Sequence, residues 1–195
     1  MKTLFLIRHA KSSWTDPALP DKDRPLGNRG RRDARKMGKR LAKRHVKPNL
    51  ILSSPARRAL KTARIIAKKL DYKRKDIVVD DRLYAGEVND LLNVIHKVGD
   101  LERVMLVGHN PELTQFAHRL SSEITHMPTC AVAEFPFEGE VVVTHRQRQA
   151  RKSGARLSKE IVGQSFASAI ACCARAARAT QPQRREALRV AINSP

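Results

Sequence analysis

The sequence predicts an α/β fold: a three-layer sandwich in which a mostly parallel central sheet is covered by helices on both faces. Through residue 120, short apolar runs alternate with longer segments whose apolar residues recur at helical spacing. The runs are nearly continuous in apolar character, which is typical of parallel strands buried on both faces. A chain of 195 residues is long enough to bury such a core within one domain.

The expected strands are short and rich in branched residues. The first is TLFLI at residues 3–7, and it is followed by NLILSS at 49–54, IVV at 77–79, VMLVGH at 104–109 and AVAEFPF at 131–137. The last of these runs alternates apolar with other residues, as a strand at a sheet edge does. The order of the strands along the chain, each separated by a helix up to residue 120, favours parallel pairing.

The expected helices carry their apolar residues on one face. Residues 29–46 form the first helix, with a strongly basic outer face, and residues 56–70 form the second. We expect Asn89 to cap the third helix, which contains Leu91 and Ile95 at helical spacing. Pro111 suits the first turn of a fourth helix, which continues through residue 120.

The chain is strongly basic, with 39 Lys and Arg against 19 Asp and Glu, a formal charge of +20 and a pI of about 10.8. Such a charge favours phosphorylated substrates, acidic proteins or nucleic acid as partners. Aromatic residues make up only 4% of the chain, and no RNA-binding or zinc-ligand motif is present. We interpret much of the charge as solvated helix faces.

The composition changes near residue 140. Residues 141–195 contain 11 Lys and Arg but 2 Asp and Glu, in segments rich in Ala and Arg, of which 164–179 and 184–192 have helical character. The sequence therefore predicts a domain over residues 1–140 and a basic appendage over 141–195. This appendage is expected to be partly helical, disordered or a partner-binding arm. One role for it is contact with nucleic acid or another polyanion.

The cysteines indicate a reducing compartment. Cys130, Cys172 and Cys173 form no CxxC motif, and two of them are adjacent, which does not suit a disulfide framework. The N-terminus lacks the pattern of a signal peptide, and the longest uncharged run is too short to cross a bilayer. We therefore expect a cytoplasmic protein without a membrane partner.

Three of the predicted strands end in basic or imidazole side chains. The first strand leads into Arg8 and His9, the second is followed by Arg57 and Arg58, and the fourth leads into His109. Each group on its own is more often an ordinary surface or capping residue. In a parallel sheet, however, ligands gather at the carboxyl ends of the strands, so these side chains are expected to share one rim.

A rim with two imidazoles and several guanidinium groups suits a phosphoryl group. A planar guanidinium group can donate two parallel hydrogen bonds to phosphate oxygens, and helix N-termini favour a bound anion. A neutral imidazole can attack phosphorus and carry it as a covalent phosphohistidine, while a second, protonated imidazole beside the anion stabilises its charge. We find no carboxylate cluster typical of a divalent-metal site, so neither a metal nor another cofactor is expected.

Three stretches, LIRHAKSSW, SSPARRALKT and LVGHNP, resemble the signatures of the histidine phosphatase superfamily, also called phosphoglycerate mutase-like. HAKSSW followed by DRPLGNRGRRDA is most similar to the SixA branch of phosphohistidine phosphatases, and the resemblance spans roughly residues 1–137. It implies that His9 is the nucleophile that becomes phosphorylated. It also implies that Arg8, Arg58 and His109 complete the phosphate pocket, with Arg57 a neighbouring residue that faces solvent or substrate.

Two departures from the family pattern bear on the substrate. Ala10 stands where many relatives have Gly after the nucleophile, and Ala85 falls where larger relatives carry a Glu that protonates the leaving alkoxide, although Asp81 and Glu87 lie nearby. Without an acid, the better substrate is a phosphohistidine, whose imidazole leaves readily. We therefore expect a metal-independent phosphatase for phosphohistidine on a protein. The alternatives are a phosphatase for small phosphate esters and a basic polyanion-binding protein.

Overall fold

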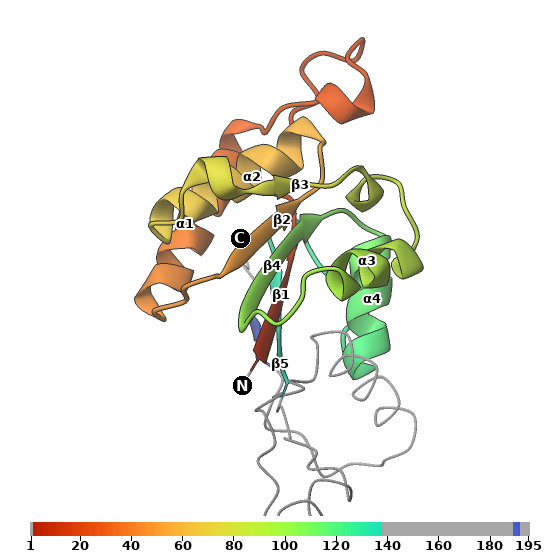
Figure 1. Ribbon diagram of the computed structural model, residues 1–195. Helices are drawn as coiled ribbons and strands as arrows, with labels where there is room; N and C mark the ends of the chain where they lie inside the picture. Colours follow the sequence, from red (N-terminus) through yellow and green to blue (C-terminus); the bar gives the residue numbers. More distant parts are fainter. Residues whose placement is uncertain (1, 138–188, 192–195) are drawn as a thin grey trace, which may run out of the picture.

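The computed structural model describes residues 2–137 and 189–191, which form one six-stranded sheet with helices on both faces (Figure 1). The strands run in the order β3-β2-β4-β1-β5-β6. Their bounds are β1 (Lys2–Arg8), β2 (Leu50–Ser53), β3 (Val78–Val79), β4 (Arg103–Gly108), β5 (Val132–Phe137) and β6 (Arg189–Ala191). The first four pair in parallel, whereas β5 runs antiparallel to β1 and to β6, so the predicted mostly parallel sheet is confirmed.

Four α-helices and three short 3-10 helices are present in the described residues. The α-helices are α1 (Asn28–Lys43), α2 (Arg57–Lys69), α3 (Val88–His96) and α4 (Glu112–Ser121), and the 3-10 helices are Asp21–Asp23, Arg74–Asp76 and Asp81–Leu83. Figure 1 shows α1 and α2 on one side of the sheet and α3 and α4 on the other. The α/β sandwich expected from the sequence is therefore observed.

Alternate residues of the central strands supply the two halves of the core. Phe5 and Ile7 of β1 pack with the apolar stripes of α1 and α2, whereas Leu4 and Leu6 pack with those of α3 and α4. Because successive side chains of a strand point to opposite faces, a strand that is apolar at every position needs a cover on both sides. This requirement explains the continuous apolar runs of β1 and β4.

Three details differ from the expectation. The run at 131–137 is not at the sheet edge, because β6 pairs with β5 and covers its outer side. This pairing also makes Arg189–Ala191 a strand, although the sequence favoured a helix over 184–192. Helix α3 is capped by Glu87 rather than Asn89, because the side chain of Glu87 and that of Asp90 each bond the other's backbone N–H in a capping box.

The rest of the appendage expected at 141–195 lies outside the described residues. None of the helices in the described part of the chain has the length and apolar character needed to cross a membrane.

Candidate active site

The carboxyl ends of three neighbouring strands meet at one rim of the sheet. Strand β4 lies between β1 and β2, with Arg8 opposite Gly108 and Ser53 opposite Val107. The backbone N–H of His9 donates to the carbonyl of Gly108 at 3.0 Å, so the pairing extends beyond the last residue of β1. Residues that follow these strands are therefore brought side by side, as the parallel arrangement predicts.

At this rim the structure brings together three of the predicted site residues. The ring centroids of His9 and His109 lie 4.9 Å apart, and Nε of Arg58 lies 3.4 Å from Nε2 of His9. All three side chains belong to the buried polar groups of the protein. Because burying such groups is costly without compensation, their convergence indicates a binding site rather than a chance surface cluster.

Arg8, the fourth predicted residue, is anchored beside this group. One terminal nitrogen of its guanidinium donates to the carbonyl of Met127 at 2.8 Å. Its Nε is buried and has no hydrogen-bond partner among the described residues. Arg8 is close enough for its charge to affect the pKa values of both His9 and His109. It therefore adds positive charge and a donor that is available to an anion.

The imidazole of His9 is held in one orientation by the backbone. Its Nδ1 lies 2.8 Å from the carbonyl oxygen of Ala10, which can only accept, so Nδ1 carries the proton. Nε2 is then unprotonated and faces the guanidinium of Arg58. Burial lowers the pKa of His9 to about 4, with the Ala10 carbonyl opposing the shift and the neighbouring arginines adding to it. His9 is therefore neutral at pH 7, and the lone pair of its Nε2 accepts from Nε of Arg58.

His109 is held by a hydroxyl group at the end of β2. Its Nε2 lies 2.8 Å from Oγ of Ser54, and that oxygen accepts from the backbone N–H of Ala56 at 3.3 Å. The hydroxyl can therefore donate to Nε2, which leaves the proton of the neutral ring on Nδ1. Nδ1 is buried and, like Nε of Arg8, has no hydrogen-bond partner among the described residues. Its N–H is therefore suited to donate to a phosphate oxygen.

The second imidazole is neutral at pH 7, not protonated as expected from the sequence. Burial, followed by the proximity of His9 and the charge of Arg58, lowers the pKa of His109 to about 3. A phosphate dianion bound at Nδ1 would raise the pKa of His109, because an adjacent negative charge favours the protonated ring.

A carboxylate that the sequence analysis missed contacts Arg58. Both terminal nitrogens of the Arg58 guanidinium donate to Asp21, one to its backbone carbonyl and the other to Oδ2 at 2.7 Å. The hydroxyl of Tyr84 also donates to Oδ2, at 3.1 Å. Asp21 thus binds the terminal nitrogens of the Arg58 guanidinium, while Nε of the same group faces His9. No motif pointed to Asp21, which lies in the 3-10 helix Asp21–Asp23, whose position depends on distant contacts.

We predict that Asp21 positions Arg58, and that Asp21→Ala lowers kcat/KM about 10- to 100-fold, as expected for loss of one charge-assisted hydrogen bond. Tyr84→Phe, which removes one hydroxyl donor to Asp21, should cost less. Asp21 also raises the pKa of His9 by its charge, so the acid limb of the pH–rate profile should move to lower pH in Asp21→Asn. An increase in kcat/KM would show instead that Asp21 obstructs the site.

The loop after His9 is tied to α2 by one side chain of the SSPARRALKT motif. Oγ1 of Thr62 accepts from the backbone N–H of Ala10 at 3.1 Å and donates to the carbonyl of Arg58 at 2.8 Å. Arg57, the residue before Arg58, is exposed to solvent. The backbone thus turns Arg58 toward His9 and leaves Arg57 outside.

The two carboxylates considered as general acids make other contacts. Asp81 is exposed and forms an ion pair with Lys22 at 3.6 Å, and Glu87 is used in the cap of α3. Ala85, between them, has a φ of 54°. None of the hydrogen bonds or ion pairs in the described residues joins Asp81 or Glu87 to His9, Arg58 or His109.

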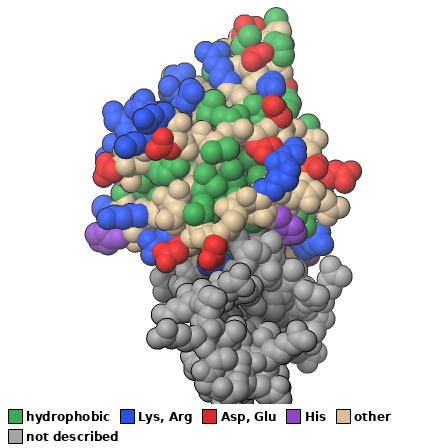
Figure 2. All heavy atoms as spheres, viewed as in Figure 1, with side chains coloured by type: hydrophobic (Ala, Val, Ile, Leu, Met, Phe, Trp, Pro, Cys, Tyr) green, Lys and Arg blue, Asp and Glu red, His purple; other side chains and the backbone are tan. Residues whose placement is uncertain are grey.

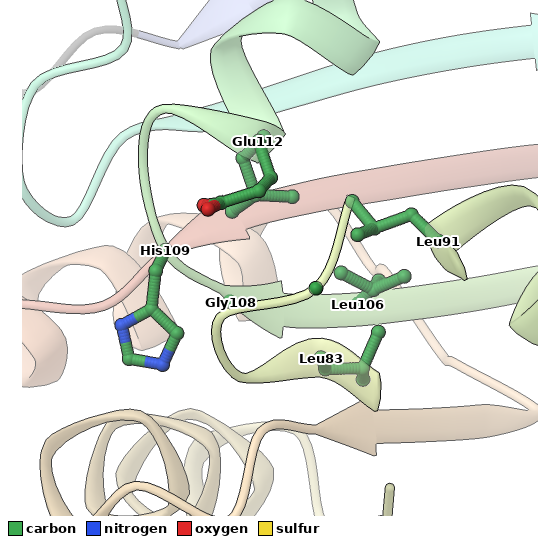
Figure 3. A pocket seen from close by; sticks show the side chains of 8 residues that line it. Leu83, Leu91, Leu106, Gly108, His109 and Glu112 are labelled. Carbon is green, nitrogen blue, oxygen red and sulfur yellow. The ribbon is translucent and has the colours of Figure 1, made fainter. Parts of the chain in front are cut away.

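A small hollow lies on the α3–α4 side of His109. Figure 3 shows Leu83, Leu91 and Leu106 gathered on one side of Gly108, with the imidazole of His109 on the other side. This hollow is lined mainly by apolar groups and does not include His9 or Arg58. Within residues 2–137 and 189–191, no three His, Cys, Asp or Glu side chains are grouped to hold a metal ion.

We predict that acid destabilises the protein through the two buried imidazoles. They have pKa values of about 4 and 3 when folded, whereas unfolded histidines have a pKa of 6.5. Between pH 6.5 and about 4 the unfolded chain therefore binds more protons, so the free energy of unfolding falls as the pH falls. The thermal midpoint should drop from pH 7.5 to pH 5, and less steeply in His109→Asn.

His118→Asn, which alters an exposed histidine of α4, is the matched control and should leave the slope unchanged. A thermal midpoint that rises on acidification would show that the buried rings are protonated in the folded protein.

The N-terminal part of the chain matches a family model, that of the histidine phosphatase superfamily (branch 1), over residues 4–92. Among curated proteins, an uncharacterized chloroplastic protein of Arabidopsis thaliana is 33% identical over 141 residues, which cover 68% of this chain and 65% of that protein. An uncharacterized protein of Mycobacterium tuberculosis is 32% identical over 117 residues, covering 60% of this chain and 70% of that protein. The chain thus spans about two thirds of the length of these relatives.

Two solved structures share the fold. One is a protein provisionally identified as the phosphohistidine phosphatase SixA of Agrobacterium tumefaciens, with a TM-score of 0.63 and 30% identity over 68% of this chain and 89% of that chain. The other is the protein histidine phosphatase SixA with bound tungstate, with a TM-score of 0.63 and 22% identity over 70% of this chain and 88% of that chain.

Proposed function

The chain belongs to the histidine phosphatase superfamily, and on this premise we propose that it removes a phosphoryl group through a covalent phosphohistidine on His9. The observation that carries this proposal is the state of His9: its Nδ1–H donates to the Ala10 carbonyl, and its unprotonated Nε2 lies 3.4 Å from Nε of Arg58. A neutral nitrogen beside a guanidinium is suited to attack a phosphorus atom whose oxygens that guanidinium binds.

The proposed reaction has two steps. The lone pair of His9 Nε2 forms a bond to phosphorus while the bond to the leaving group breaks, and the leaving group takes up a proton from water. Water then attacks the phosphorus of the phosphohistidine, which releases orthophosphate and restores neutral His9. Arg8, Arg58 and His109 bind the oxygens in both steps, where their donors stabilise the charge of the transition state.

We further propose that the substrate is a phosphohistidine on a protein. The support is that Asp81 pairs with Lys22 and Glu87 caps α3, so neither carboxylate that the sequence offered as the acid is bonded to His9, Arg58 or His109. Asp21 is also unsuited, because the hydrogen bond and charge of Arg58 outweigh burial and lower the pKa of its carboxyl group. An alkoxide leaves slowly without a proton, whereas the imidazole of a phosphohistidine leaves readily.

The test compares kcat/KM of the full chain for a phosphohistidine peptide, phosphoramidate, p-nitrophenyl phosphate and an unactivated sugar phosphate. A general acid typically accelerates a reaction at least about 100-fold, so the P–N substrates should exceed the sugar phosphate by that factor or more. Faster hydrolysis of the sugar phosphate would replace the proposal with a phosphatase for small esters. The polyanion-binding role expected of the appendage falls on residues outside those that the structure describes.

A further inference from the structure

The positive charge of the described residues is concentrated in one helical layer. Helix α1 contains eight Lys and Arg and one Asp, and α2 contains six Lys and Arg and no acidic residue. On the opposite face of the sheet, α3 and α4 together contain one Arg. Figure 2 shows Lys and Arg side chains gathered over the region of α1 and α2. The asymmetry is not required by the fold, because both layers cover the same sheet.

The exposed charges form a regular stripe on each of these helices. On α2 the stripe consists of Arg57, Lys61, Arg64 and Lys68, and on α1 of Arg32, Lys36, Lys39 and Lys43; all eight are exposed. Both sets have the spacing i, i+4, i+7 and i+11, which places four side chains along one side of a helix over about 16 Å. We call these eight residues the basic helical surface.

The basic helical surface is not neutralised within the described residues. The ion pairs at α1 join Arg29 to Asp33 and Arg44 to Glu134, and neither includes one of the eight residues. Like charges spaced four residues apart repel one another and weaken a helix. The arrangement therefore has a cost in the free protein, and an acidic partner would remove it.

Both stripes begin beside the phosphate site. Arg57, the first residue of the α2 stripe, directly precedes Arg58 in the first turn of the helix. Helix α1 starts against the loop that follows His9, where a Cβ on Gly30 would lie only 2.1 Å from the carbonyl oxygen of Lys11. A macromolecule that presents a phosphoryl group to His9 would consequently lie next to the beginning of both stripes.

We propose that the basic helical surface docks the acidic surface of the protein that carries the phosphohistidine. This inference rests on the proposed function, and it adds the character of the partner: Asp and Glu side chains beside the phosphorylated residue. Nucleic acid fits less well, because single strands bind through exposed aromatic side chains and neither stripe contains one. Helices α1 and α2 also pack side by side on the sheet, whereas sequence-specific duplex recognition places a helix or strand in a groove.

The test uses two synthetic twelve-residue peptides, each phosphorylated on one histidine, with four Glu in one and four Gln at the same positions in the other. Electrostatic steering changes association rates by about 10- to 1000-fold, so the acidic peptide should have at least about 10-fold higher kcat/KM at low salt. This preference should diminish as NaCl is added. Phosphoramidate, which is too small to reach the stripes, serves as the reference substrate.

The variant Lys61→Glu/Arg64→Glu should abolish the preference without changing phosphoramidate turnover. The matched control is Arg103→Glu/Arg119→Glu, which makes the same change in net charge at exposed positions outside the basic helical surface. It should retain most of the preference. Equal loss in both variants would overturn the proposal in favour of a general charge effect, and equal rates for the two peptides with the wild type would overturn it directly.

Two further measurements separate the remaining outcomes. Fluorescence anisotropy of the unphosphorylated acidic peptide measures docking without catalysis. Failure to hydrolyse phosphoramidate would refute the proposed function, and the anisotropy titration would still decide whether the peptide docks. Competition with polyglutamate and with single- and double-stranded oligonucleotides identifies the class of partner. Stronger competition by an oligonucleotide would assign the surface to nucleic acid and refute the proposal.

Discussion

His9→Asn is expected to lower kcat by at least about 10⁴-fold and to eliminate the phosphoenzyme, as loss of a nucleophile does in other enzymes with covalent intermediates. Asn is the conservative choice because its amide can still donate to the carbonyl of Ala10, the acceptor that holds His9 Nδ1. It has no lone pair at the position of Nε2, so the attack on phosphorus is lost while the surroundings are kept.

The measurement is a rapid quench with radiolabelled phosphoramidate, followed by peptide mapping under alkaline conditions that preserve phosphohistidine. Label should appear on the peptide that contains His9 in the wild type and on no peptide in His9→Asn. His118→Asn, at an exposed position of α4, should behave as the wild type. Label on a serine or an aspartate would show that the nucleophile has been assigned to the wrong residue.

Arg58→Ala is expected to reduce kcat/KM by about 10²- to 10³-fold, the typical loss when one donor to a transition-state oxyanion is removed. Arg58 contacts His9 through Nε and Asp21 through both terminal nitrogens, so the proposed role is to neutralise a phosphoryl group at His9 from a fixed position. Arg58→Lys should restore little activity, because a single ammonium group cannot make these contacts together.

Arg57→Ala is the matched control for Arg58→Ala, since it removes the same side chain from the preceding, exposed position. With phosphoramidate as substrate it should keep activity within about twofold of the wild type, as is usual for a surface change that leaves the site intact. A larger loss in Arg57→Ala than in Arg58→Ala would mean that the arginine of the SSPARRALKT motif is the earlier of the two.

The sheet and its helices could be predicted because the information is local. The run from Leu4 to Ile7 has no polar residue, and its alternate members do contact opposite helical layers. Two interpretations were wrong. The outer partner of β5 lies more than fifty positions away in the chain, so no local pattern identifies it. The cap of α3 is a local choice between two nearby residues, and the reciprocal bonds of Glu87 and Asp90 decide it against Asn89.

The site was predictable where its residues directly follow strands. Arg8, His9 and His109 occupy positions that the parallel sheet dictates, and the motif supplied Arg58. Asp21 and Tyr84 could not be found in this way, because Asp21 contacts Arg58 from a short 3-10 helix and Tyr84, at the end of another, contacts Asp21. The segment that carries Asp21 is positioned by Arg24, whose guanidinium is buried against Trp14 and donates to Ser12 Oγ at 2.9 Å.

The separation of the site residues along the chain has a consequence for how activity reports on folding. His9 and Arg58 lie 49 positions apart, and they meet only when β1 and β2 are both in register with β4. No single hairpin or helix pair contains both residues, so a folding intermediate that lacks one of these strand pairings does not bring His9 and Arg58 together. Catalysis and the native sheet should therefore appear and disappear together, and the rate of turnover can serve as a count of correctly folded molecules.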